Sequence, residues 1–116
     1  MADNVSQKIL VNMDTSMSLG RMYAQAAHAS MLAILKQGSW EDNNFIISCD
    51  KKPELLYWMK YSFTKVMLRI WVEDKILSIL EKVKASNIPY GLMEEDGFIT
   101  ALAVGPYLTS EIDKII

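Results

Sequence analysis

Three polar side chains able to support acid–base or anion-binding chemistry, Arg21, Gln25 and His28, fall within eight residues of this 116-residue chain. In a helix with 3.6 residues per turn, positions i, i+4 and i+7 lie on one face, so the spacing predicts that the three side chains share a surface. Histidine is the residue type whose ordinary pKa lies near neutrality. As the only histidine of the chain, His28 is the first candidate for a general acid or base, although a lone histidine is also often a structural hydrogen-bonding group.

Arg21 and Gln25, on the same helix face as His28, indicate which ligand such a site would bind. Arg21 lies near the expected start of the helix, where free backbone N–H groups attract anions, so a phosphate or a carboxylate is its expected ligand. The Gln25 amide can both donate and accept hydrogen bonds, which suits it to orient a carbonyl group or a water molecule. Singly, each could be a solvent-exposed side chain. Together, and surrounded by alanines that would let another backbone or a substrate approach closely, they predict an open polar site.

Hydrophobic periodicity and turn residues predict the elements that position this site. Their expected order is β α α β α β β α, with strands at 8–14, 65–72, 90–93 and 98–104 and helices at 19–37, 53–63, 73–87 and 109–116. The polar stretch 40–52 is expected to be a loop. Asp96-Gly97 lies between the last two strands and fits a two-residue hairpin turn. The predicted fold class is α/β, a three-layer-like, mixed four-stranded sheet flanked by helices, in a single domain over residues 1–116.

Composition narrows the classes of function. Hydrophobic residues make up 51% and charged residues 22% of the chain, values typical of a folded globular protein. The strongest apolar run, 66–72, is interrupted by Arg69, and the first eight residues do not resemble a signal peptide, so we expect no membrane partner and a cytoplasmic location. One cysteine, Cys49, and one histidine cannot form a zinc site, so we expect no metal and no cofactor. A net charge of −2 argues against extensive coating of nucleic acid but allows local basic patches.

The helix motif resembles that of a known family. Gly20-Arg21-Met22-Tyr23-Ala24-Gln25-Ala26-Ala27-His28-Ala29 is similar to the helix signature of the archaeal and eukaryotic type of peptidyl-tRNA hydrolase, in which Gly-Lys is followed by Ala-Gln and then Ala-His-Ala. The likeness continues through Asn87-Ile88-Pro89 and the closing Val104-Gly105-Pro106, and so covers nearly the whole chain in order. It implies the type II fold of that family, and hydrolysis of the ester that joins a peptide to the 3′ end of tRNA.

The resemblance also implies roles for individual residues. Arg21 takes the place of the family's basic residue and would hold a tRNA phosphate or the developing oxyanion. Gln25 and His28 fall on the family's glutamine and histidine, and the site carboxylate would be Asp96 or, with another placement, Glu95. The implied mechanism is attack by a water molecule that His28 activates, with the carboxylate orienting the imidazole and Arg21 stabilising negative charge.

Substrate contacts are expected from Gly20, Arg21, Glu95 and Thr100, of which Thr100 is the only candidate for the family's threonine. Arginine stands where the family usually has lysine, and the two cations place their donors differently. The last hairpin is considerably shorter than the usual family pattern. The chain therefore resembles a divergent branch of the family.

Two other functions fit the same residues. The chain could be a non-catalytic module that binds RNA or a protein partner, or a hydrolase that acts on another acyl ester. Catalysis predicts that His28, Gln25 and a carboxylate of Glu95 or Asp96 converge in one cleft bordered by Arg21. A homodimer is also possible, and an exposed Trp58 or Trp71 would favour it.

Overall fold

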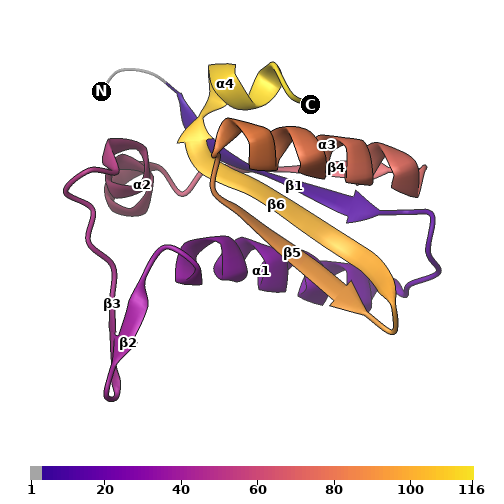
Figure 1. Ribbon diagram of the computed structural model, residues 1–116. Helices are drawn as coiled ribbons and strands as arrows, with labels where there is room; N and C mark the ends of the chain where they lie inside the picture. The colour runs from indigo at the N-terminus through magenta and orange to yellow at the C-terminus, as the bar shows by residue number, and fades with distance from the viewer. Residues whose placement is uncertain (1–3) are drawn as a thin grey trace.

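A mixed four-stranded sheet forms the centre of the fold, which a computed structural model describes for residues 4–116 (Figure 1). The strands lie in the order β4-β1-β6-β5, with bounds β1 (Val5–Asn12), β4 (Lys65–Ile70), β5 (Tyr90–Glu95) and β6 (Phe98–Leu108). β1 pairs in parallel with β4 and antiparallel with β6, and β5 pairs antiparallel with β6. The predicted mixed four-stranded sheet is therefore confirmed.

Helices cover both faces of the sheet and give three layers (Figure 1). α1 (Leu19–Leu35) packs on one face through small side chains, whereas α3 (Glu73–Ser86) and α4 (Thr109–Asp113) pack on the other through branched ones. The buried alanines on the α1 side are Ala26, Ala29, Ala33, Ala101 and Ala103. Among residues 4–116, no helix has the length and apolar character needed to cross a membrane.

The expectation of a loop over 40–52 is wrong for part of that stretch. Two short strands, β2 (Ser39–Glu41) and β3 (Asn44–Ile46), form a hairpin that extends away from the main sheet (Figure 1). Trp40 and Phe45 are opposite each other in it, with ring centroids 5.2 Å apart, and Asp42 supplies the positive φ of 55° at the turn. This aromatic cross-strand pair stabilises a hairpin that the surrounding polar residues conceal in the sequence. The helix that follows is divided into α2 (Pro53–Tyr57) and a π-helical turn, η1 (Trp58–Ser62).

A buried polar pair fixes α1 over the sheet. Gln7, in the central strand β1, is fully buried, and its Nε2 donates to the backbone oxygens of Ser30 at 3.2 Å and Gly105 at 3.3 Å. The Ser30 hydroxyl donates in turn to Gln7 Oε1. A buried polar group without a hydrogen-bond partner destabilises the folded protein. Because a shift of α1 would separate Gln7 from Ser30, this pair favours one position of α1 relative to β1 and β6.

Gly91 lets α1 approach β5 closely. A Cβ atom at this position would lie 2.4 Å from the backbone oxygen of Ala29 and 2.5 Å from the backbone nitrogen of Ala33, distances that side chains do not tolerate. A glycine within a strand often marks such a close backbone approach. As a result, α1 lies directly beside β5, and its first turns come close to the β5–β6 hairpin (Figure 1).

Candidate active site

The first turn of α1 carries the helix half of the site. The Ser18 hydroxyl caps the helix by accepting a hydrogen bond from the Arg21 backbone nitrogen at 3.2 Å. Gly20 is exposed, and a Cβ atom built on it would meet nothing within 4 Å. The space in front of Gly20 is therefore open to a ligand.

The turn between β5 and β6 positions the other half of the site. Asp96 and Gly97 have φ angles of 55° and 82°, and Glu95 pairs with Phe98, so the turn has the two residues that the sequence predicts. Positive φ at both central positions is typical of the tight hairpin turns that match the twist of paired strands. This turn places Glu95 at the last position of β5, facing α1.

An irregularity in β6 directs Thr100 toward α1. Met93 pairs with Ala101 and Glu94 with Ile99, which leaves Thr100 as an extra residue in the ladder. Such a β-bulge changes the direction of a side chain, and here Thr100 faces α1 together with the adjacent Ala101. Ile99 packs in the core on the opposite face of the sheet. The bulge thus brings the Thr100 hydroxyl to the helix.

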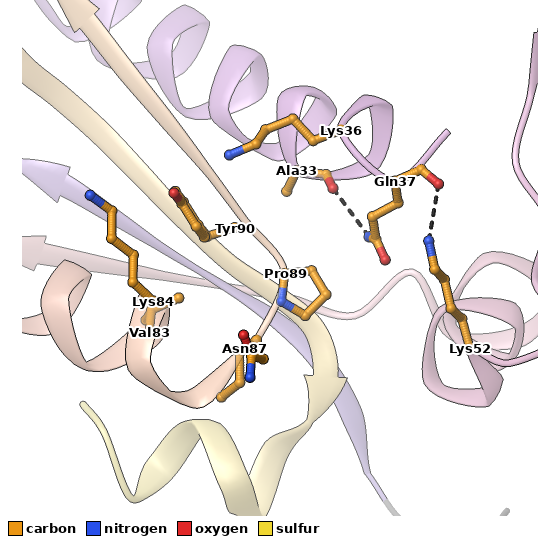
Figure 2. A pocket seen from close by; sticks show the side chains of 10 residues that line it. Ala33, Lys36, Gln37, Lys52, Val83, Lys84, Asn87, Pro89 and Tyr90 are labelled. Atoms are coloured by element: carbon orange, nitrogen blue, oxygen red, sulfur yellow. Dashed lines mark hydrogen bonds between the residues drawn. The ribbon is translucent and has the colours of Figure 1, made fainter. Parts of the chain in front are cut away.

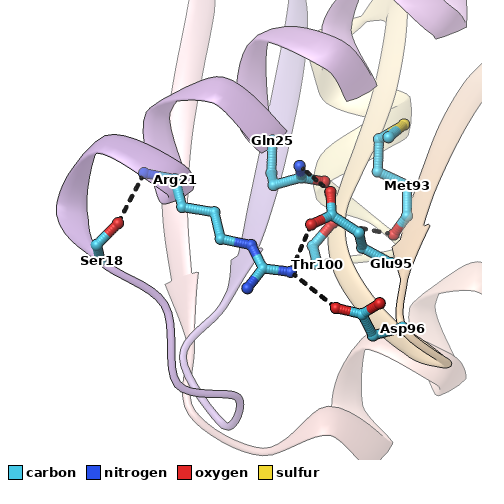
Figure 3. A network of polar contacts seen from close by, with 7 residues as sticks. All are labelled: Ser18, Arg21, Gln25, Met93, Glu95, Asp96 and Thr100. Atoms are coloured by element: carbon cyan, nitrogen blue, oxygen red, sulfur yellow. Dashed lines mark hydrogen bonds and ion pairs between the residues drawn. The ribbon is translucent and has the colours of Figure 1, made fainter.

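The two halves meet in a hydrogen-bonded set that we call the Glu95 network, made of Arg21, Gln25, Glu95, Asp96 and Thr100 (Figure 3). Arg21 Nη2 donates to Glu95 Oε1 at 2.5 Å, and Gln25 Nε2 donates to Glu95 Oε2 at 2.6 Å. The Thr100 hydroxyl donates to Gln25 Oε1 at 2.6 Å and lies 3.3 Å from the Met93 backbone oxygen. Arg21 Nη2 is 3.6 Å from Asp96 Oδ2. Both the guanidinium and the amide are therefore held in fixed orientations.

The two carboxylates of the network differ in their surroundings. The Glu95 side chain is 42% exposed and bonds both Arg21 and Gln25, whereas the Asp96 side chain is 82% exposed and only approaches Arg21. Of the two carboxylates considered from sequence, the geometry brings Glu95 into contact with Gln25. Arg21 does bind a carboxylate, but this carboxylate is the side chain of Glu95 and not a ligand. One cation beside two carboxylates gives the network a net negative charge.

His28 lies outside these contacts. Its side chain is exposed, and none of the side-chain hydrogen bonds or ion pairs found for residues 4–116 includes it. The buried face of α1 runs through Ala26, Ala29 and Ala33, which turns position 28 toward solvent. The structure thus brings Arg21, Gln25 and Glu95 together as expected, without a contact between the imidazole and the carboxylate.

The alanines around the polar cluster divide between the two uses that the sequence suggests, and sequence reasoning missed one residue that positions the site. Ala26 and Ala29 are buried against the sheet, so only Ala24 and Ala27 remain exposed among the alanines around the polar cluster. The missed residue is Gly91, whose role is in the backbone. Thr100 was expected at the site, but the bulge that directs its hydroxyl to Gln25 was not. A glycine inside the strand pattern at 90–93 was the one available signal.

Helix α1 and the hairpin at the sheet edge define an α/β protein with a polar site at the start of its first helix. The family model described as "Peptidyl-tRNA hydrolase PTH2" matches residues 5–116, and the chain belongs to this family. A peptidyl-tRNA hydrolase of Methanococcus vannielii is 29% identical to the chain, over 94% of this chain and 91% of its own length. The peptidyl-tRNA hydrolase of Methanopyrus kandleri is 29% identical over 94% and 90% of the two chains. That of Saccharolobus solfataricus is 26% identical over 96% and 93%.

Proposed function

We propose that this chain is a peptidyl-tRNA hydrolase, which cleaves the ester between a peptide and the 3′ end of tRNA. Membership of the family over residues 5–116 and the names of the archaeal relatives support this function. The observation that carries it is the Glu95 network, because it connects the arginine and glutamine of the helix motif to a carboxylate of the last hairpin. A polar site built from two elements distant in sequence supports catalysis better than a solvated helix face does.

Each residue has a proposed role in the reaction. Glu95 positions Arg21 and Gln25, and Thr100 fixes the orientation of the Gln25 amide. A guanidinium has five N–H donors, so Arg21 retains donors for the oxygen that becomes negatively charged as the ester is attacked. Gly20 leaves room for the substrate beside them.

His28 is the proposed base. It lies three residues after Gln25 on the same helix, and at this spacing neighbouring Cβ atoms are about 5–6 Å apart. The oxygen of a water molecule bonds to the ester carbonyl carbon while its proton passes to the imidazole. The bond to the 3′ oxygen of the tRNA then breaks, and the imidazole returns a proton to that oxygen.

A hydrolysis assay with N-acetylaminoacyl-tRNA tests the function. The wild-type chain is expected to release the acylated amino acid, and His28→Ala is expected to lower kcat by about 10²-fold, the usual contribution of a general base. Equal rates for the two proteins would refute the role of His28. Absence of hydrolysis by wild-type protein that still binds the tRNA would support a non-catalytic RNA-binding module instead, and cleavage of other acyl esters alone would indicate another substrate.

We also propose a homodimer. An apolar groove of about 660 Å³ lies between α1, η1 and β4, and the exposed side chains Tyr23, Met31, Phe63 and Met67 line it. Exposed apolar patches are typical of interaction surfaces, and the unpaired edge of β4 beside the groove gives a second copy a backbone to contact. Of the two tryptophans considered from sequence, Trp58 is buried and Trp71 is exposed.

Light scattering with size-exclusion chromatography tests the dimer. The wild-type chain is expected to elute with the mass of two copies, and Met31→Lys with the mass of one. Leu77→Lys, at an exposed position of α3 away from the groove, is the control and is expected to stay dimeric. A monomeric wild-type protein at high micromolar concentration would overturn the proposal.

We further infer that the protein is located in the cytoplasm, because the substrate that we propose for it arises during translation. The free thiol of Cys49 is compatible with a reducing compartment. Fractionation of cells that express the tagged chain is expected to place it with the cytoplasmic proteins. Recovery with membranes or from the medium would contradict this inference.

A further inference from the structure

A basic pocket lies at the end of α1 opposite to the Glu95 network. It has a volume of about 450 Å³, and its polar lining comes from Lys36, Gln37, Lys52, Lys84, Asn87 and Tyr90 (Figure 2). We call it the lysine pocket. Its three lysines come from three different elements: Lys36 follows α1, Lys52 precedes α2, and Lys84 is in the last turn of α3. Within residues 4–116, no acidic side chain lines it.

Two of the three lysines are held in place by contacts that do not neutralise them. Lys36 Nζ lies 3.8 Å from the centre of the Tyr90 ring, and Lys52 Nζ donates to the Gln37 backbone oxygen at 3.0 Å (Figure 2). The ion pairs found within residues 4–116 involve other cations, namely Lys8, Arg21 and Lys114. Lys52 also lines the adjoining hollow, where Glu54 and Lys51 are the other charged residues. Three lysines outside the ion pairs, lining one pocket, create a positive potential that attracts anions.

Helix ends explain only part of this arrangement. Helix C-termini favour cations, which accounts for Lys36 and Lys84 individually. Lys52 belongs to a different element, and its ammonium group is nevertheless directed to the same pocket by the Gln37 carbonyl. The lysines of three different elements thus line one pocket, with Lys36 and Lys84 beside Tyr90 and Lys52 beside Gln37, and this arrangement favours an anionic ligand (Figure 2).

We propose that the lysine pocket binds phosphate groups of the tRNA backbone while the ester lies at the Glu95 network; this rests on the proposed function above. The network has only one cation, Arg21, which is bonded to Glu95, lies close to Asp96 and has its remaining donors assigned to the reacting ester. With a net charge of −2, the chain needs a local basic surface to bind RNA. Flexible lysines suit this task, since phosphate contacts position a nucleic acid without reading its sequence.

The distance between the two sites fits one RNA molecule. Lys36 follows Arg21 by fifteen residues along α1, and a rise of 1.5 Å per residue places their backbones about 22 Å apart. β5 runs beside α1 from Tyr90 in the lysine pocket to Glu95 in the network (Figure 1). A tRNA continues from its single-stranded 3′ end into a double-stranded stem, so stem phosphates can reach the lysine pocket when the terminal ester lies at Glu95.

Fluorescence anisotropy with uncharged tRNA tests the proposal through the double variant Lys36→Gln/Lys84→Gln in the full chain. Its matched control is Lys60→Gln/Lys82→Gln, which removes two exposed lysines outside the pocket, one of them on α3. We expect about tenfold weaker binding for the pocket variant. Losing two phosphate contacts also reduces the magnitude of the negative slope of log K against log salt concentration by about 1.4–1.8. This slope is measured between about 50 and 200 mM salt. The control is expected to match the wild type in both measurements.

Kinetics separate this proposal from the function on which it rests. The pocket variant is expected to raise KM for N-acetylaminoacyl-tRNA about tenfold with unchanged kcat, and to leave KM unchanged for the same ester on a CCA trinucleotide, which lacks the stem. Inorganic phosphate is the free-anion probe: if it displaces tRNA from wild type and pocket variant equally, the pocket does not hold the displaced phosphates. The proposal for the lysine pocket alone would be overturned if the wild type hydrolyses both substrates and the pocket variant changes neither KM nor the salt slope. A wild type that hydrolyses neither ester would overturn the function, while the anisotropy data would still report on the pocket.

Discussion

Replacing Glu95 by glutamine tests whether the Glu95 network serves chemistry or only holds the hairpin to α1. The carboxylate accepts from Arg21 through one oxygen and from Gln25 through the other. A glutamine amide keeps the shape but offers only one oxygen, so its NH₂ group must face one of these two donors. Glu95→Gln therefore loses one hydrogen bond and the charge, whichever way the amide turns.

The expected cost in stability is small. Hydrogen bonds to a charged group contribute about 1.5–3 kcal/mol, but exposed ion pairs contribute only about 0.2–1 kcal/mol. With the Glu95 side chain 42% exposed, solvent weakens both contacts, and we expect a loss of about 1 kcal/mol in the free energy of unfolding. For a chain of this size that corresponds to a fall in Tm of about 4 °C.

The expected cost in activity is much larger, because Arg21 and Gln25 lose the group that orients them. Misplacing a donor for the developing oxyanion lowers kcat by about 10²–10³-fold. Thermal unfolding and hydrolysis of N-acetylaminoacyl-tRNA at saturating substrate measure the two effects on the same protein. Glu94→Gln is the control, since Glu94 is the exposed neighbour of Glu95 on β5, and it is expected to retain the wild-type kcat. A Glu95→Gln protein with the kcat of this control would refute a role for the network in the chemistry.

Two further predictions concern how α1 is held on the sheet. Gly91→Ala places a methyl group against the backbone of α1, which cannot move aside locally. We therefore expect the free energy of unfolding, measured with urea, to fall by about 3 kcal/mol, the upper end of the usual cost of overpacking. Gly20→Ala, where the added methyl meets nothing, should be neutral or stabilising, and equal effects of the two changes would contradict the close approach. Ser30→Ala leaves Gln7 Oε1 buried without its donor and should cost about 1–3 kcal/mol in the same assay. A value below about 0.5 kcal/mol would mean that the pair does not stabilise the position of α1.

The sequence predicts most of the elements because their local signals agree with the tertiary structure. Asp96-Gly97 forms the expected turn, since few residues adopt positive φ at two successive positions. The hairpin of β2 and β3 was not predicted, because it is stabilised by a pair of aromatic rings across the strands and not by a hydrophobic pattern within either strand.

For the site, helical spacing correctly grouped Arg21 with Gln25 but could not place His28. The three positions do lie on one side of α1, yet the boundary between buried and exposed surface passes between Gln25 and His28. That boundary depends on how the alanines of α1 pack against β6, which is a tertiary property. The choice between Glu95 and Asp96 likewise depended on the turn geometry, which turns Asp96 to solvent.

The bulge at Thr100 constrains how this hairpin can change in length. Glu95 directly precedes the two turn residues, whereas Ile99 and Phe98 separate Thr100 from the turn. Because side chains alternate along a strand, a single residue added to one arm has no partner on the other arm and must enlarge the turn or form a second bulge. Residues added to both arms beyond Glu95 and Phe98 pair with each other and leave the register of Glu95 and Thr100 with Gln25 unchanged. The hairpin can therefore become longer in matched pairs of residues without losing the site, but it cannot become shorter without losing Glu95.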